Sequence, residues 1–295
     1  MLKRTFFYLF IGLVWASCEE EIPLDKLNPY TEKLVVNEIF TNDDVFSIQI
    51  SNSKDAYQSN NPQVLDSSKL KVVLLENNVV VPLVYDVFAD VFNSNIKPQA
   101  GKTYTLKVSS GSFTPITAVG VVPPVISNKT ATYTQDGGID MQGNKSDLLK
   151  ISFQDDPATK DYYKVNFFYY SELVDKFNAF EFEAKDVLAA INTTKTRDGG
   201  YLFSDETFSG QLKTITAVPP AGLVKFNTGA KYLIQIERLS SDYWKYNTTL
   251  EQYRGSLSGG TNSTNLFRGA VVVYSNVVNG LGIFAGSSIE RDTIK

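Results

Sequence analysis

Short runs of alternating apolar and polar residues recur along the first third of the chain and predict β-strands. The segments KLVVNEIF (33–40) and VFSIQIS (45–51) are rich in β-branched and aromatic residues and are separated by the turn-like TNDD (41–44). KTYTLKVSS (102–110) alternates regularly, so that its apolar and polar side chains fall on opposite faces. Period-two alternation is typical of strands with one buried face, and here it places Tyr104, Leu106 and Val108 on that face.

A second pair of runs predicts a hairpin. KLKVVLLENN (69–78) ends in an Asn-Asn turn and is followed by VVVPLVYD (79–86). Pro82 inside the second run predicts an edge strand or a bulge, because proline cannot donate to a strand ladder. With SFTPITAVGVV (112–122), these strands predict a β-sandwich of the immunoglobulin or fibronectin type III kind. Pro123 and Pro124 then predict an interdomain joint.

The second half of the chain is also β-rich, with longer elements. We expect a hairpin across Pro157, formed by LLKISFQDD (148–156) and DYYKVNFFYYSE (161–172). The second of these runs carries aromatic rings on both faces. A central strand buried on both sides and an aromatic ligand platform both fit this pattern, and the buried strand is favoured. The polar segment 127–147 predicts short strands and loops.

One segment has the pattern of a helix. Tyr243, Tyr246, Leu250 and Tyr253 fall at helical spacing within SDYWKYNTTLEQYRGS (241–256). Ser241 or Asp242 is expected to cap its first turn and Gly255 to end it. Before this helix, GLVKFNT (222–228) and KYLIQIERLS (231–240) predict a hairpin, and after it AVVVYSNV (270–277) predicts a long strand.

Together these elements predict an all-β protein with an N-terminal immunoglobulin- or fibronectin-like β-sandwich and a second antiparallel β domain that carries one short helix. The expected boundaries are a signal peptide at 1–17, a lipidated tether at 18–32, the β-sandwich domain at 33–124 and the second β-rich domain at 125–295.

The N-terminus carries an export signal. Lys3 and Arg4 precede an apolar stretch from Phe6 to Trp15, and small residues then lead to Cys18. The stretch is shorter than the ~20 apolar residues that cross a bilayer. The order also resembles the lipobox of bacterial lipoproteins, with Trp15 where an aliphatic residue is usual. We expect cleavage before Cys18 and acylation of its thiol; a signal peptidase I substrate with an incidental cysteine is the alternative.

The residues that follow Cys18 indicate to which face of the membrane the protein is exported. Glu19, Glu20 and Glu21 form an acidic run that resembles the export signal of surface lipoproteins in the Bacteroidota; an ordinary charged tether is the alternative. Residues 22–32 contain two prolines and read as an extended linker. Cys18 is the single cysteine of the 295 residues, which excludes a disulfide framework and a cysteine-based metal site.

Net charge and composition exclude several classes of partner and of catalytic or metal site. The formal charge of the chain is −4, and loss of Lys3 and Arg4 with residues 1–17 changes it to 26 − 32 = −6. A mildly acidic protein lacks the basic field that phosphate binding needs, so no nucleic-acid partner is expected. Histidine is absent, which excludes Ser-His-Asp and Cys-His catalysis and histidine-ligated metals. No phosphate-binding glycine motif occurs either.

Carboxylate pairs are the remaining enzymatic route. The candidates are Asp155 with Asp156, Asp205 with Glu206, and Glu181 with Glu183. Neighbouring residues on a strand point to opposite faces, so the first two pairs are poorly placed to share a substrate. Acidic turns at 42–44 and 155–156 have the oxygen ligands that calcium prefers, but turn-forming acids explain them equally. We therefore expect no enzyme activity, no catalytic residue, no metal and no cofactor beyond the lipid on Cys18.

Several motifs together resemble one protein family. YSNVVNGLGIFAGSS (274–288) is similar to the C-terminal signature of the DUF4249 lipoproteins of the Bacteroidota. Other stretches match in the same order: the lipobox, LVVNEIF (34–40), AGKTYTLKV (100–108), the VPP joint, DDPATKDYYKV (155–165), LFSDETFSG (202–210) and SSDYWKYNTTLEQY (240–253). Glu38 stands where the family often has glycine. We expect Gly280, Gly282 and Gly286 to serve backbone needs rather than ligand contact.

The resemblance implies location and a class of partner. It implies an outer-membrane lipoprotein that faces the cell surface and serves as a non-enzymatic accessory, binding or lid-like, of a TonB-dependent outer-membrane transporter. The alternatives are a structural subunit of a larger outer-membrane assembly and, least favoured, a carboxylate-dependent glycoside hydrolase. Four aromatic residues are the expected contacts, because rings supply large contact area at low entropic cost: Tyr169, Tyr170, Trp244 and Tyr246.

Overall fold

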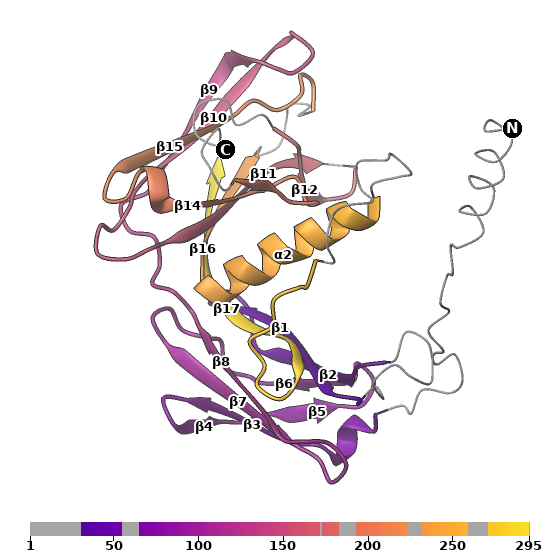
Figure 1. Ribbon diagram of the computed structural model, residues 1–295. Helices are drawn as coiled ribbons and strands as arrows, with labels where there is room; N and C mark the ends of the chain where they lie inside the picture. The colour runs from indigo at the N-terminus through magenta and orange to yellow at the C-terminus, as the bar shows by residue number, and fades with distance from the viewer. Residues whose placement is uncertain are drawn as a thin grey trace, which may run out of the picture.

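The computed structural model describes residues 31–54, 65–171, 173–182, 193–223, 232–258 and 271–294. Within them the chain is all-β apart from one α-helix and two short 3-10 turns, as the sequence predicts. Figure 1 shows two β lobes, one above the other, with the helix α2 beside the strands that join them. Cys18 and Glu19–Glu21 lie outside the described residues. So do parts of the expected hairpin at 222–240.

The first lobe is a sandwich of two sheet layers. One layer is a four-stranded sheet in the order β4-β3-β7-β8. The other is the end of a ten-stranded sheet, in the order β1-β2-β6-β5. The strands are β1 (Leu34–Thr41), β2 (Ser47–Asn52), β3 (Lys71–Glu76), β4 (Val79–Val81), β5 (Val84–Asp86), β6 (Val91–Asn93), β7 (Thr103–Ser109) and β8 (Ile116–Val121), with a 3-10 turn η3 (Ser67–Lys69) before β3.

The alternation seen in the sequence builds the core of this lobe. Tyr104, Leu106 and Val108 are buried on one face of β7, as predicted. The Asn77-Asn78 turn joins β3 to β4, and both asparagines have positive φ, as a tight hairpin turn requires. The run 79–86 is not one strand. It breaks at Pro82 into β4 and β5, which are edge strands of different sheets, so the edge position expected from the proline is confirmed.

The second lobe packs a three-stranded sheet, β15-β10-β9, against the other part of the ten-stranded sheet, β13-β14-β11-β16-β17. The elements are β9 (Thr130–Ile139), β10 (Lys145–Gln154), β11 (Tyr162–Ser171), β12 (Lys176–Ala179), β13 (Thr194–Lys195), β14 (Tyr201–Ser204), η4 (Asp205–Thr207), β15 (Leu212–Ala217), β16 (Tyr232–Leu239), α2 (Ser241–Ser258) and β17 (Leu281–Ile294). β12 pairs with β11 off the main path. β9 is a ten-residue strand where only short strands and loops were expected.

The hairpin predicted across Pro157 is wrong. β10 and β11 belong to different sheets, and β11 pairs with β12, β14 and β16 instead. Phe153 on β10 and Tyr163 on β11 meet with ring centroids 4.9 Å apart in one core. The chain therefore crosses from one layer to the other at Pro157. Apolar alternation shows that each strand has a buried face, but face-to-face and edge-to-edge arrangements satisfy it equally.

Helix α2 lies where the sequence places it, with different ends. Ser240, not Ser241 or Asp242, caps it: the Tyr243 N–H donates to Ser240 Oγ at 3.3 Å, and the Trp244 N–H donates to the Ser240 carbonyl. Gly255 does not end the helix, which continues to Ser258. Within the described residues, no helix is both long and apolar enough to cross a membrane.

β17 joins the two lobes. Its first half, from Leu281 to Ser287, pairs in parallel with β1. Its second half, from Ser287 to Ile294, pairs antiparallel with β16. Phe284 faces the core of the first lobe, whereas Ile283 and Ala285 pack with Tyr243 beneath α2. One strand thus fixes both lobes and the helix, and the ten-stranded sheet runs across the boundary expected at residue 124.

The segment 271–277 is not the strand that its sequence predicts. It lies beside β17 without a strand ladder, and the side chain of Asn276 replaces the ladder. Asn276 Oδ1 accepts the Phe284 N–H at 3.0 Å, and its Nδ2 donates to the Phe284 carbonyl at 2.8 Å and the Val119 carbonyl at 3.0 Å. The Asn276 amide bonds to backbone groups of both Phe284 and Val119. The valines of segment 271–277 therefore need not form a strand ladder.

Candidate functional site

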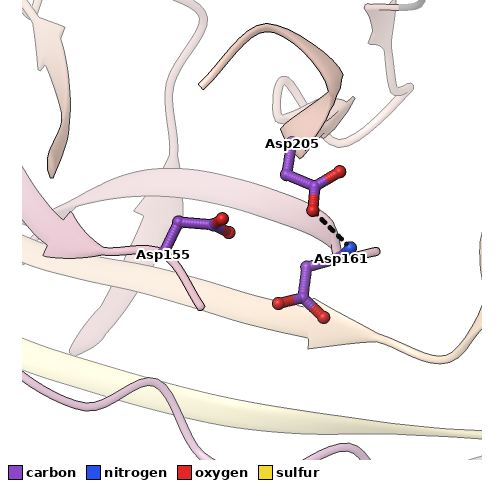
Figure 2. A group of neighbouring side chains, drawn as sticks. All are labelled: Asp155, Asp161 and Asp205. Carbon is purple, nitrogen blue, oxygen red and sulfur yellow. Dashed lines mark hydrogen bonds between the residues drawn. The ribbon is translucent and has the colours of Figure 1, made fainter. Parts of the chain in front are cut away.

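Three aspartates converge in the second lobe (Figure 2). Asp155 directly follows β10, Asp161 directly precedes β11 and Asp205 opens η4 after β14. Their exposed fractions are 1%, 6% and 3%, so solvent scarcely reaches them. One carboxylate oxygen from each lies within 4.8 Å of the others. We call these residues the aspartate cluster.

Hydrogen bonds hold each carboxylate of the cluster in place. Asp155 accepts the Tyr163 hydroxyl at 2.6 Å and the Gly210 N–H at 2.8 Å. Asp205 accepts the Asp161 N–H at 2.8 Å, while its own N–H donates to the Asp161 carbonyl at 3.1 Å. The cluster therefore ties the crossing between β10 and β11 to the turn after β14.

Arg238 supplies the positive charge at this site. On β16 it lies opposite Tyr163, and its Nη2 is 2.5 Å from Asp161 Oδ2 and 2.9 Å from Thr159 Oγ1. Burial, reinforced by the charges of Asp155 and Asp161, raises the pKa of Asp205. Burial and the bond to Asp155 likewise raise the pKa of Tyr163, which stays protonated as a donor. One guanidinium against three acids leaves the cluster short of positive charge.

The chemistry open to the cluster follows from this geometry. Carboxylate oxygens suit a hard cation such as Ca²⁺ or Mg²⁺, and Asp155, Asp161 and Asp205 are the residues that would hold one. Glycoside hydrolysis needs two carboxyl groups about 5–10 Å apart on either side of a sugar. The oxygens here are closer and buried beneath protein, so the arrangement fits a structural tie between strands better than an open catalytic pair.

A second buried polar group lies on the sheet face that α2 partly covers. Glu237 on β16 is 5% exposed and accepts hydrogen bonds from Gln235 Nε2 at 2.7 Å and Ser287 Oγ at 3.3 Å. Lys164, opposite it on β11, pairs with Asp198 at 2.6 Å. Burial raises the pKa of the Glu237 carboxyl. Glu237 and Lys164 thus each have polar partners where β16 pairs with its neighbouring strands.

Two of the carboxylate pairs considered from the sequence have one buried and one exposed member, although neither pair lies on a strand: Asp155 and Asp156 follow β10, and Asp205 and Glu206 lie in η4. Asp155 is buried and Asp156 exposed, and Asp205 is buried and Glu206 exposed. The buried members, Asp155 and Asp205, come together in the aspartate cluster. Glu181 is exposed and pairs with Lys195 at 2.6 Å, whereas Glu183 lies outside the described residues.

Two side chains of the acidic turn at 42–44 bind residues of β17. Asn42 Oδ1 accepts the Ile289 N–H at 2.7 Å, and Asp43 pairs with Arg291. Asp44 Oδ1 accepts the Val45 N–H at 2.8 Å. These contacts explain the acids as parts of the turn that meets the C-terminal strand.

The four aromatic residues chosen as contacts lie in three places, all partly buried. Trp244 and Tyr246 are together on α2, where Trp244 stacks on Tyr162 with centroids 5.1 Å apart. Tyr169 packs against the second-lobe core. Tyr170 contacts the Phe177 ring at 5.5 Å. On the same strand Phe167 is fully buried, as a central strand requires. Trp244 and Tyr246, two residues apart on α2, both pack against the same core cluster.

Sequence reasoning missed one member of the aspartate cluster and the arginine that contacts it. Asp161 and Arg238 were not selected, and Asp155 and Asp205 were considered only with their neighbours. The six-residue spacing of Asp155 and Asp161 across a proline turn is a weak signal that their side chains meet. Arg238, over 70 residues further along, has no such signal, because the pairing of β16 with β11 brings it there.

Comparison with protein-family models gives a match over nearly the whole chain. The family model described as "Domain of unknown function (DUF4249)" matches residues 19–293, nearly the whole chain. No curated protein matches the sequence.

Proposed function

The chain belongs to the DUF4249 family, and from this premise we propose that it is a surface-exposed outer-membrane lipoprotein that serves as a non-enzymatic accessory of a TonB-dependent transporter. In this role it holds substrate or covers the barrel from outside. The observation that carries the proposal is the N-terminal order of basic residues, apolar run and Cys18, followed by three glutamates and a short tether.

The anchor is the best supported part of the proposal. Acyl chains contribute ~0.8 kcal/mol per buried CH₂, so several chains on one cysteine hold a protein at a bilayer almost permanently. Twelve residues separate Cys18 from Thr31, where the described β body begins. They extend at most about 45 Å and therefore keep the body close to the membrane.

The accessory role rests on the family resemblance and on the character of the buried acids. The aspartate cluster is closed by Tyr163, Arg238 and backbone N–H groups and lies beneath the surface. A carboxylate pair that works on a sugar must be open to that sugar. The arrangement therefore supports a binding or assembly role over hydrolysis.

A structural subunit is the second candidate. Val79 and Val80 on β4 are 70% and 64% exposed, and β4 is the edge of its sheet. An apolar edge strand can accept a strand from another chain. This feature favours a permanent contact with another protein and requires no small ligand.

Pull-down of tagged protein from native outer membranes in mild detergent tests these roles. Stoichiometric recovery of a TonB-dependent barrel supports the accessory role. Recovery of other assembly proteins without that barrel overturns it in favour of the structural subunit. A Cys18→Ala variant, examined by membrane fractionation, tests the anchor separately and should leave the membrane fraction.

A further inference from the structure

The turn between β5 and β6 exposes an apolar surface. Phe88 is 99% exposed, its sequence neighbour Val87 is 67% exposed, and Val84 at the start of β5 is 72% exposed. A single exposed aliphatic residue is common on protein surfaces. A fully exposed phenylalanine next to one exposed valine, with a second exposed valine four residues away in the sequence, is a stronger indication of a contact surface. We call residues 84–90 the Phe88 turn.

The Phe88 turn is preformed. Asp86 Oδ1 accepts the N–H groups of Phe88 at 2.9 Å and Ala89 at 3.2 Å. Asp90 has a φ of +53°, and its Oδ1 accepts the Tyr85 hydroxyl at 2.9 Å. Both acids are thus engaged within the turn while the phenyl ring points outward. Presenting the ring costs no further ordering when it meets a partner.

Strand register places this turn at the end of the lobe where the tether enters. Leu34 at the start of β1 is opposite Asn52 at the end of β2. β6 is antiparallel to β2, with Ser47 opposite Asn93, so β6 begins toward the Asn52 end. The turn before β6 therefore projects past the same end as Leu34. Figure 1 shows β1, β2, β5 and β6 together in the lower lobe.

We propose that the Phe88 turn rests in the lipid interface beside the anchor and orients the protein on the membrane. The inference relies on the proposed Cys18 anchor, whose tether enters at this end. A protruding ring without a complementary groove suits a fluid interface, which needs no matching shape. Because Asp86 and Asp90 carry negative charge, the surface it fits is zwitterionic lipid rather than strongly anionic lipid.

The test uses the full mature chain, coupled through the thiol of Cys18 to maleimide-headgroup lipid in phosphatidylcholine vesicles. Phe88→Trp places a reporter in the turn. Leu173→Trp is the matched control, because Leu173 is 94% exposed in the turn between β11 and β12 of the other lobe. The unaltered mature chain, whose single tryptophan is Trp244, gives the background.

Quenching by brominated phosphatidylcholine is the measurement. We expect the tryptophan at position 88 to be quenched and blue-shifted, at a depth of ~5–10 Å, while the one at position 173 behaves as in water. Equal quenching at the two positions overturns the proposal and leaves the turn as a surface for a protein partner. Since the coupling is chemical, this result is independent of acylation in cells and of any transporter.

Discussion

At the scale of single residues, buried acids in this protein are satisfied to different degrees. The aspartate cluster has a guanidinium, a hydroxyl and backbone donors. Glu38 has fewer polar partners than these aspartates. It occupies an inward position of β1, in line with Val36 and Phe40, and accepts the Ser47 N–H at 3.2 Å. Burial, with Asp44 adding repulsion, raises the pKa of Glu38 to about 7.

Glu38 should therefore make stability fall with rising pH. Its folded pKa lies above the unfolded value of 4.5, so the folded state binds the proton more tightly. The contribution of Glu38 to the free energy of unfolding should be largest below pH 4.5 and should be lost as pH rises through about 7. Glu38→Gln keeps an acceptor for Ser47 and should raise the free energy of unfolding at pH 8 by about 1–3 kcal/mol. Urea titrations of both proteins at pH 4 and pH 8 check this, and identical pH slopes would contradict it.

Arg238 should matter far more than an exposed cation. Arg238→Met removes the positive charge of the aspartate cluster and leaves its carboxylates buried without compensation. We expect a loss of about 3–5 kcal/mol in the free energy of unfolding at pH 7. Lys195→Met is the control, because its pair with Glu181 is exposed and should contribute less than about 1 kcal/mol. If Arg238→Met and Lys195→Met lower the free energy of unfolding equally, in thermal and urea unfolding, the aspartate cluster does not stabilise the fold as we describe.

At the scale of elements, β17 depends on close backbone approach. Gly282 has a φ of +100°, and a Cβ atom there would lie 2.0 Å from the Val36 carbonyl oxygen. At Gly286 a Cβ would lie 2.5 Å from the Val121 carbonyl oxygen. These glycines let β1 and β8 approach β17 closely. The backbone role expected for the glycine signature is thereby confirmed.

Two glycine substitutions should have opposite effects. Gly282→Ala should disrupt the β1–β17 pairing and lower the free energy of unfolding by more than about 3 kcal/mol, because strain and overlap combine. Gly255→Ala should raise it by about 0.5–1 kcal/mol, since Gly255 lies inside α2 with nothing within 4 Å of a Cβ. Chemical denaturation of the two variants measures both. A destabilising Gly255→Ala would argue against a helix that continues past this position.

At the scale of the whole molecule, one strand links two hydrophobic cores. β17 pairs with β1 of the first lobe and with β16 of the second. Its Ile283 and Ala285 also pack with Tyr243 beneath α2. Melting either lobe exposes part of the β17 ladder and the surface under the helix. The division into domains at 33–124 and 125–295 therefore remains a prediction about folding units.

We expect the two lobes to unfold together. Hydrogen exchange of the Val36 amide in the first lobe and the Ile234 amide in the second should report the same global opening free energy. Fluorescence of Trp244 and far-ultraviolet circular dichroism should give coincident urea transitions. Two separated transitions would instead support independent domains. Gly282→Ala should separate them if the joint is the cause of the coupling.

The sequence alone determined the features that depend on local chemistry. Alternation identified β1, β2, β3, β7 and β8 of the first lobe but not the short β6, because a half-buried strand presents apolar side chains at every second residue. Pro82 indicated the edge position of the run that contains it, since proline cannot donate to a ladder. Helical spacing placed α2, and the motif order identified the family. The strand, proline and helix signals are each read within one segment of the chain.

Only the tertiary structure decided which segments meet. Alternation gives a strand a buried face but no partner, so β10 and β11 could form a hairpin or face each other across a core. The valine-rich segment 271–277 has strand propensity, yet the Asn276 amide replaces its ladder. The aspartate cluster and its Arg238 come from four separate stretches of the chain. Such sites are fixed by sheet order, and sheet order is a property of the folded chain.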